Sequence, residues 1–77
     1  MDIEVKVFGQ LTDLTGSAAL RICDVRDTDE LRALLADRYP PLKDHPYAIA
    51  VDRKIISVKT NLESGSVVVL MPPFSGG

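Results

Sequence analysis

The chain has 77 residues, one cysteine and a formal net charge of −2 at pH 7. This length indicates one domain with a small core, because short chains bury only about 60% of the surface that they expose when unfolded. The charge argues against nucleic-acid binding, which needs a basic surface to neutralise phosphates. A single cysteine excludes an internal disulfide and a cysteine-rich metal cluster, so we expect no metal site.

The sequence also lacks the patterns of a targeting or membrane segment. Residues 1–4 have neither the basic nor the apolar part of a signal peptide. The longest apolar run is Val67–Met71, far short of the roughly 20 residues that a membrane span needs. We therefore expect a cytoplasmic protein that does not associate with membranes.

The first predicted element is a strand near the N-terminus. Apolar residues alternate with other residues along 3–8, which is typical of a strand with one buried face. Phe8 falls on the charged side of this alternation, where it either curls over the strand end or lies exposed. Residues 9–16 form a connection in which Leu11 and Leu14 have the spacing of one short helical turn.

Two side chains with reactive chemistry are interpreted as non-catalytic. Cys23 lies on the polar face of a second predicted strand over 19–25, and no histidine or asparagine is spaced to activate its thiol. His45 is the only histidine and lies in a predicted loop over 42–46. No second histidine or cysteine nearby completes a metal site, so we expect a solvated loop residue.

One helix is predicted, over Thr28–Arg38. Asp27 at the N-cap with Glu30 three residues later would form a capping box, and Thr28 is the alternative cap. Two prolines at 40 and 41 end the helix. Apolar residues recur at helical spacing and form one stripe that we expect to pack on a sheet: Leu31, Leu34, Leu35 and Tyr39.

The second half of the chain predicts three more strands. Residues 47–51 form the first, 52–54 turn a hairpin, and 55–58 return as a short strand. After a loop over 60–66, Val67–Met71 is apolar on both faces, which is typical of a central strand with a parallel neighbour. The fold class is therefore α+β of the β-grasp (ubiquitin-like) type. It has a mixed β-sheet, one main helix on one face and an extended C-terminal tail.

The tail, 72–77, reads Pro-Pro-Phe-Ser-Gly-Gly and follows a domain over 1–71. The two prolines remove backbone donors and fix φ, so strand pairing stops and the chain leaves extended. Gly76 and Gly77 have no side chains, so nothing shields the terminal carboxylate and the backbone can enter a narrow slot. The last three residues alone extend by about 10 Å. The tail can therefore place its carboxylate inside another protein while the domain stays outside.

In its predicted strands, helix and tail, the chain resembles the MoaD/ThiS family of ubiquitin-like sulfur carriers over nearly its whole length. The double proline before Phe-Ser-Gly-Gly is the specific part, and it is typical of the molybdopterin branch rather than of the thiamin carriers. Two turns depart from the family pattern, at Ser66 and at the pair Asp52 and Arg53, and these concern local turn geometry. The matching segments are 5–8, 28–38, 50–52, 62–67 and 70–77.

The resemblance implies a sulfur carrier with no catalytic groups and no bound cofactor of its own. A ubiquitin-activating-type adenylyltransferase (MoeB-like) would use ATP to join the Gly77 carboxylate to AMP. A persulfide sulfur would then displace AMP and leave a thiocarboxylate. Inserted in the large subunit of molybdopterin synthase (MoaE-like), the tail would deliver this sulfur to the pterin precursor, cyclic pyranopterin monophosphate. The inserted residues would be Pro72, Pro73, Phe74, Ser75 and Gly76.

A docking surface is also predicted on the domain. Leu62 is an isolated apolar residue in a polar loop, and Phe74 is an aromatic residue on an otherwise bare tail. With Phe8 and Met71, they are expected to form an exposed apolar patch that binds the large subunit, since such patches on small domains usually mark interfaces.

Other functions stay open at this point. A carrier that feeds thiamin or cysteine synthesis, or a ubiquitin-like modifier that forms isopeptide bonds through Gly77, would need the same activated glycine. A plain β-grasp interaction module would need no activated glycine, and its function would survive removal of the tail.

Overall fold

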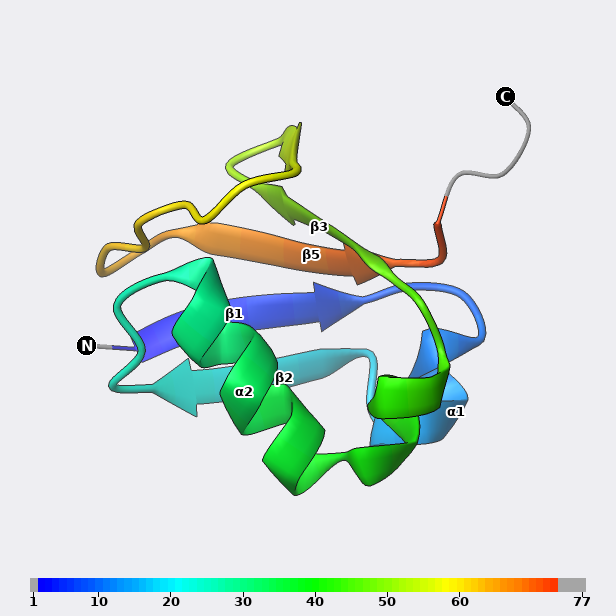
Figure 1. Ribbon diagram of the computed structural model, residues 1–77. Coiled ribbons are helices and arrows are strands. Elements are labelled where there is room, and N and C mark those ends of the chain that lie inside the picture. Colours follow the sequence, from blue (N-terminus) through cyan, green and yellow to red (C-terminus); the bar gives the residue numbers. More distant parts are fainter. Residues whose placement is uncertain (1, 74–77) are drawn as a thin grey trace.

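The protein folds around one mixed β-sheet in the computed structural model, which describes residues 2–73. The sheet has five strands in the order β2-β1-β5-β3-β4. The central pair, β1 and β5, is parallel, and the other neighbouring pairs are antiparallel. The elements are β1 (Asp2–Val7), α1 (Leu11–Thr15), β2 (Ala19–Cys23), α2 (Thr28–Arg38), the 3₁₀ helix η1 (Pro40–Asp44), β3 (Ala48–Val51), β4 (Lys54–Ile56) and β5 (Val67–Met71) (Figure 1).

Helix α2 crosses one face of this sheet, and the core lies between them (Figure 1). Alternate residues of β1 are buried, as the period-two pattern predicts. On the helix, Leu31 and Leu35 are fully buried against the sheet, while Leu34 and Tyr39 pack at the edge of the core. The predicted mixed sheet with one main helix on one face is therefore confirmed.

The N-terminus of α2 is capped by Asp27. Its Oδ1 accepts a hydrogen bond of 2.9 Å from the backbone N–H of Glu30. The Glu30 side chain in turn accepts from the backbone N–H of Arg26 at 2.7 Å, one residue before the cap. Thr28, the alternative cap, is the first helical residue, and its hydroxyl accepts from the backbone N–H of Thr60. Asp27 is thus the N-cap. The second bond of the predicted capping box, from Glu30 back to the cap, goes to the N–H of Arg26 instead of that of Asp27.

Several boundaries differ from those predicted. Strand β2 ends at Cys23, and the predicted loop after α2 contains η1, which was not expected. The β3–β4 turn is tighter than predicted, because Asp52 and Arg53 both adopt positive φ, at 49° and 73°. Residues with side chains seldom adopt this conformation. Here Asp52 is held in place, since its carboxylate and its backbone N–H both bond to the backbone of Val67.

Candidate functional site: the root of the tail and the open face of the sheet

The tail leaves the domain at the end of β5, beside the turn that follows β1. Pro72 and Pro73 come directly after the last strand residue, Met71. The remaining predicted site residues are outside the part of the chain that the structure describes: Phe74, Ser75, Gly76 and Gly77. The structure therefore places the root of the tail, and it leaves the roles predicted for these four residues untested.

Gly9 packs against the first proline of the tail. It has a φ of +64°, and a Cβ at this position would be 2.8 Å from Cγ of Pro72. One residue earlier, the backbone N–H of Phe8 donates to the carbonyl oxygen of Leu70 at 2.9 Å. The turn after β1 is thus fastened to β5 and leaves no space for a side chain against Pro72. These contacts set the direction in which the chain leaves the sheet.

Sequence reasoning missed this role of Gly9. A glycine directly after an amphipathic strand was the available signal, because it indicates either a left-handed turn or a close approach of another segment. Gly9 combines both. The approach itself joins residues far apart in the sequence, so the pattern around Gly9 could not identify Pro72 as the neighbour.

A groove of about 300 Å³ lies beside the root of the tail. Its walls are mainly apolar and come from α1, from the segment after η1 and from the first tail residues. The principal lining residues are Leu11, Leu14, His45, Pro46, Pro72 and Pro73. The groove therefore continues the surface of the tail root onto the body of the domain.

The sheet face opposite α2 is open. It is apolar over β3, β4 and β5, whereas over β1 and β2 it carries charged residues such as Glu4, Lys6 and Arg21. Along β5, Val68 and Leu70 are buried under the helix, whereas Val67 is 40% exposed and Val69 and Met71 are half-buried. Because neighbouring strand residues point to opposite faces, these last three share the open face. We call the apolar part of this surface the open face; it consists of Phe8, Ala48, Ala50, Ile55, Val67, Val69 and Met71.

Two residues of the open face expose more than half of their surface to solvent, Phe8 and Ile55. Phe8 is 53% exposed at the end of β1, which decides between its two predicted placements in favour of exposure. Ile55 is 64% exposed on β4, opposite Ala50, which in turn is opposite Val69. An apolar row therefore runs across three strands. Ala50 itself is only 4% exposed, so Phe8, Ile55 and Val67 supply most of the exposed apolar surface. Exposed apolar residues grouped in this way are typical of interaction sites on small proteins.

The predicted exposure of Leu62 is wrong. Its side chain is 5% exposed and belongs to the core, and its backbone N–H donates to the carbonyl oxygen of Arg26 at 2.8 Å. The loop that carries it forms a single β-bridge with the N-cap region, between Asn61 and Asp27, and so turns Leu62 inward. Leu62 therefore cannot belong to an exposed patch, and Ile55 and Val67 supply the exposed apolar surface instead.

Cys23 and His45 both lie exposed and are tied to neighbours. The Cys23 thiol donates to Oδ1 of Asp2 at 3.1 Å, and this bond raises the pKa of the thiol, which disfavours the nucleophilic thiolate. Nδ1 of His45 is 2.9 Å from the carbonyl oxygen of Pro41, so this nitrogen carries the proton and donates. Within residues 2–73, no group of three or more His, Cys, Asp or Glu residues is placed to hold a metal ion.

The same described residues contain no helix that is both long and apolar enough to cross a membrane.

The family model of the ThiS family matches residues 5–77. Comparison with curated proteins gave no match. Among solved structures, a chain of the complex of subunits 1 and 2 of molybdopterin-converting factor from Helicobacter pylori is 34% identical. The alignment covers 100% of both chains with a TM-score of 0.75.

Two archaeal structures are similar in fold. A putative molybdopterin converting factor, subunit 1, from Pyrococcus furiosus is 23% identical over 96% of this chain and 99% of that one, with a TM-score of 0.84. Small archaeal modifier protein 1 from Methanosarcina acetivorans is 22% identical over 99% of this chain and 96% of that one, with a TM-score of 0.80. The family match spans nearly the whole sequence and the fold agrees with it, so the chain belongs to the ThiS family of ubiquitin-like sulfur carriers.

Proposed function

We propose that the protein is the small, non-catalytic subunit of a molybdopterin synthase and carries sulfur on the carboxylate of Gly77. The observation that supports this best is the root of the tail, where the Gly9 turn packs against Pro72 directly after β5 ends. A domain whose last strand ends at Met71 and whose Pro72 is held against Gly9 suits delivery of a terminal group to another protein. The 34% identity to a chain of a molybdopterin-converting factor complex favours this pathway.

The proposed chemistry begins with activation, because a carboxylate is a poor electrophile. The Gly77 carboxylate attacks the α-phosphorus of ATP in an adenylyltransferase, which forms an acyl-adenylate and releases pyrophosphate. The terminal sulfur of a protein persulfide then attacks the acyl carbon and releases AMP. A thiol cleaves the resulting sulfur–sulfur bond, which leaves the thiocarboxylate on Gly77 and a disulfide on the donor. All catalytic groups in this scheme belong to the partners.

Delivery requires docking on the large subunit, and we assign this contact to the open face together with the tail. Phe8, Ile55 and Val67 are exposed apolar residues on a sheet face whose other side is covered by α2. The tail leaves from the edge of this same surface, after Met71. A partner seated on the open face therefore also lies where the tail begins, and Phe74 and the residues after it can enter that partner. The chain 34% identical to this one was solved in a complex of subunits 1 and 2.

The experiment that tests the carrier function is intact-mass measurement. Incubated with ATP, a ubiquitin-activating-type adenylyltransferase and a persulfide donor, the protein should gain the mass difference between one sulfur and one oxygen atom. A serine appended after Gly77 should abolish this gain, whereas the same serine placed before Met1 should leave it intact. Cys23→Ser should also keep the gain. A mass gain that survives the appended C-terminal serine contradicts the proposal.

The pathway is tested separately, because a thiocarboxylate at Gly77 would also serve a carrier for thiamin or cysteine synthesis. The thiocarboxylated protein should convert a pterin precursor when the large synthase subunit is present. A ubiquitin-like modifier would instead form a ladder of conjugates on a blot of cell lysate. The similarity to small archaeal modifier protein 1 concerns the fold alone, so it does not favour a modifier function over a carrier function.

A further inference from the structure

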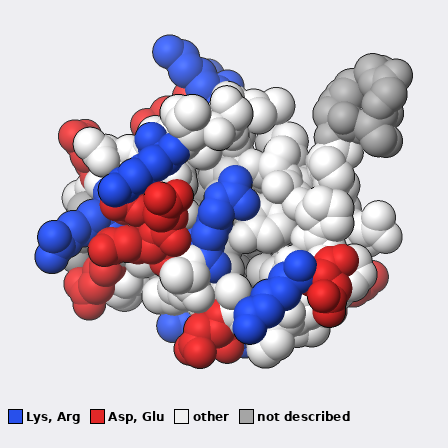
Figure 2. Space-filling model, viewed as in Figure 1, with Lys and Arg blue, Asp and Glu red and all other residues white. Residues whose placement is uncertain are grey.

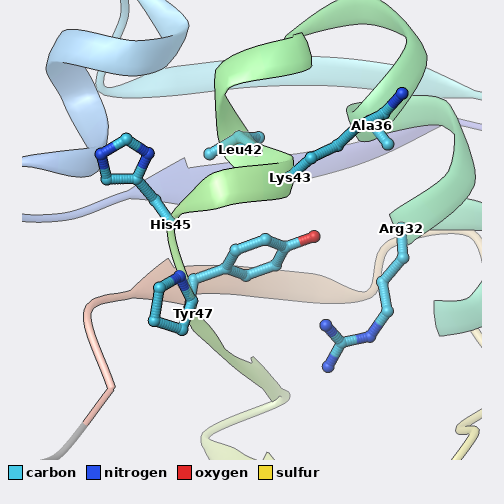
Figure 3. Close-up of a pocket in the computed structure, with 7 residues that line it drawn as sticks. Arg32, Ala36, Leu42, Lys43, His45 and Tyr47 are labelled. Atoms are coloured by element: carbon cyan, nitrogen blue, oxygen red, sulfur yellow. The ribbon is translucent and has the colours of Figure 1, made fainter.

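A second hollow lies on the helix-covered side of the protein, between α2, η1 and the start of β3 (Figure 3). It has a volume of about 420 Å³ and opens to solvent. Arg32 comes from α2 and places its guanidinium beside Tyr47, whereas Lys43 comes from η1 and directs its amino group toward Ala36, on the other side of Tyr47 (Figure 3). The Tyr47 hydroxyl points between these two charged ends (Figure 3). Ala36 adds apolar surface, while Leu42 is only 3% exposed. We call this hollow the Tyr47 pocket.

The two cations of the Tyr47 pocket have no counter-ion among the residues that the structure describes. Within residues 2–73, neither Arg32 nor Lys43 lies within salt-bridge distance of a carboxylate, and no acidic residue lines the pocket. The Arg32 guanidinium carbon is 5.4 Å from the centroid of the Tyr47 ring, which attracts and orients the guanidinium. On this face, Lys and Arg surface near the middle of the molecule borders uncharged surface on one side and Asp and Glu surface on the other (Figure 2). A positive site therefore exists on a protein whose net charge is −2.

The His45 ring does not point into this site. It points away from Tyr47 in Figure 3, and its Nδ1 donates to the Pro41 carbonyl oxygen. His45 and Pro46 line both the Tyr47 pocket and the groove at the root of the tail. They form the ridge between these two hollows, so a ligand in the Tyr47 pocket is a close neighbour of the tail root.

We propose that the Tyr47 pocket binds a carboxylate side chain from an acidic segment of a protein partner. The Arg32 fork offers paired donors that match a carboxylate, and the Tyr47 hydroxyl is a further donor beside it. Lys43, on the other side of Tyr47, offers a second positive charge to another residue of the same segment (Figure 3). The apolar surface of Ala36 suits the methylene stem of a glutamate, whereas a free inorganic anion has no apolar part to contact it.

The form of the pocket favours a protein segment over a small anion. Arg32 and Lys43 are exposed, and the pocket is lined by the middle of α2 and the end of η1, so no helix N-terminus contributes its backbone donors. Phosphate sites usually gather such donors around the ligand. A partner segment that covers the pocket would exclude water and strengthen both charge contacts. The proposal does not depend on the chemistry at Gly77, because every residue involved belongs to the folded domain.

The test is an NMR titration of the full-length, isotope-labelled protein with three probes: hexaglutamate, hexaglutamine and inorganic phosphate. Hexaglutamate should shift the resonances of Arg32, Lys43 and Tyr47, and its affinity should fall as salt rises, because exposed charges are screened. Hexaglutamine should cause no shifts there. Phosphate that shifts the same resonances with equal or higher affinity overturns the proposal in favour of a small-anion site. Absence of shifts in the pocket with hexaglutamate also overturns it.

Matched variants separate the pocket from general charge attraction. Lys43→Glu should weaken hexaglutamate binding by about tenfold or more, equivalent to about 1.4 kcal/mol. Lys54→Glu makes the same charge change on β4, outside the pocket, and should leave the affinity within about twofold. Arg32→Lys keeps the charge but loses the fork, and Tyr47→Phe keeps the ring but loses the hydroxyl. Each should weaken binding by a few-fold. Equal losses in Lys43→Glu and Lys54→Glu contradict the assignment.

Discussion

The two faces of strand β5 are both apolar, but the protein covers only one of them. Val68 and Leu70 point under α2 and are fully buried, while Val67, Val69 and Met71 point to the open face and keep part of their surface in contact with water. All five residues are apolar, so the sequence treats both faces alike. Apolar surface that a domain leaves uncovered next to the root of its tail is typical of a place where a partner binds.

The largest expected effect comes from the covered face. Val68→Ala removes buried methyl groups and leaves a cavity, so the free energy of unfolding should fall by about 2–3 kcal/mol. The adjacent substitution Val67→Ala changes the same atoms on the open face and should cost less than about 1 kcal/mol. Urea denaturation of both variants measures the difference. Equal losses would mean that the two faces of β5 are equally buried in solution.

The second prediction concerns binding through the open face. Ile55→Ala should weaken the complex with the large subunit by about 1–3 kcal/mol, as for truncation of an interface anchor, and leave the melting temperature nearly unchanged. Lys54→Ala changes the neighbouring residue, which points to the other side of β4, and should leave the affinity unaltered. Calorimetric titration checks both variants. If Lys54→Ala weakens the complex as much as Ile55→Ala, the docking surface lies elsewhere.

The third prediction sharpens the link between the open face and the tail. Gly9→Ala and Gly16→Ala both place a side chain at positive φ, which costs about 1–2 kcal/mol. Only Gly9→Ala also drives a Cβ into Pro72, since nothing lies within 4 Å of a Cβ at Gly16. Gly9→Ala should therefore lose more stability and slow sulfur transfer, measured by intact mass over time. Identical behaviour of the two variants would show that the Pro72 contact does not position the tail.

The smallest expected effect is a pH dependence of the free energy of unfolding, which comes from Asp27 at the N-terminus of α2. The backbone N–H of Glu30, followed by the charge of Lys59, holds the pKa of Asp27 below its ordinary value of 3.8. Because the folded-state pKa is the lower one, this carboxylate stabilises the fold above the unfolded-state pKa, and the stabilisation is lost as pH falls through the folded-state pKa. Asp27→Asn should flatten the fall in stability below about pH 4. An unchanged acid profile in this variant would contradict the capping role.

The sequence predicted correctly those features of the fold and the candidate site that depend on residues close together in the chain. The N-cap at Asp27, the apolar stripe of α2 and the alternation of β1 are set by residues within a few positions of one another, and these predictions are confirmed. The predicted exposure of Leu62 was wrong because the direction of a loop residue depends on what the loop packs against. Here the loop packs against the N-cap region of α2. The same limit applies to Gly9, whose constraint comes from Pro72 at the far end of the chain.

The open face shows a different limit of sequence reasoning. A strand that is apolar on both faces predicts burial on both, and the position of β5 in the middle of the sheet is confirmed. Helix α2, however, covers one face only (Figure 1). Ile55 and Val67 were not singled out because each is an ordinary strand residue. Only the pairing register, which sets Ile55 opposite Ala50 and Ala50 opposite Val69, brings the apolar row together.

The most direct measurement of the carrier function follows sulfur from Gly77 to product in a single turnover. Thiocarboxylated protein is mixed with the large synthase subunit and the pterin precursor, and intact mass and dithiolene product are measured together. We expect two protein molecules to lose their sulfur, and to return to the carboxylate mass, for every dithiolene formed. Formation of dithiolene at the normal rate by protein that lacks Gly77 would contradict the account.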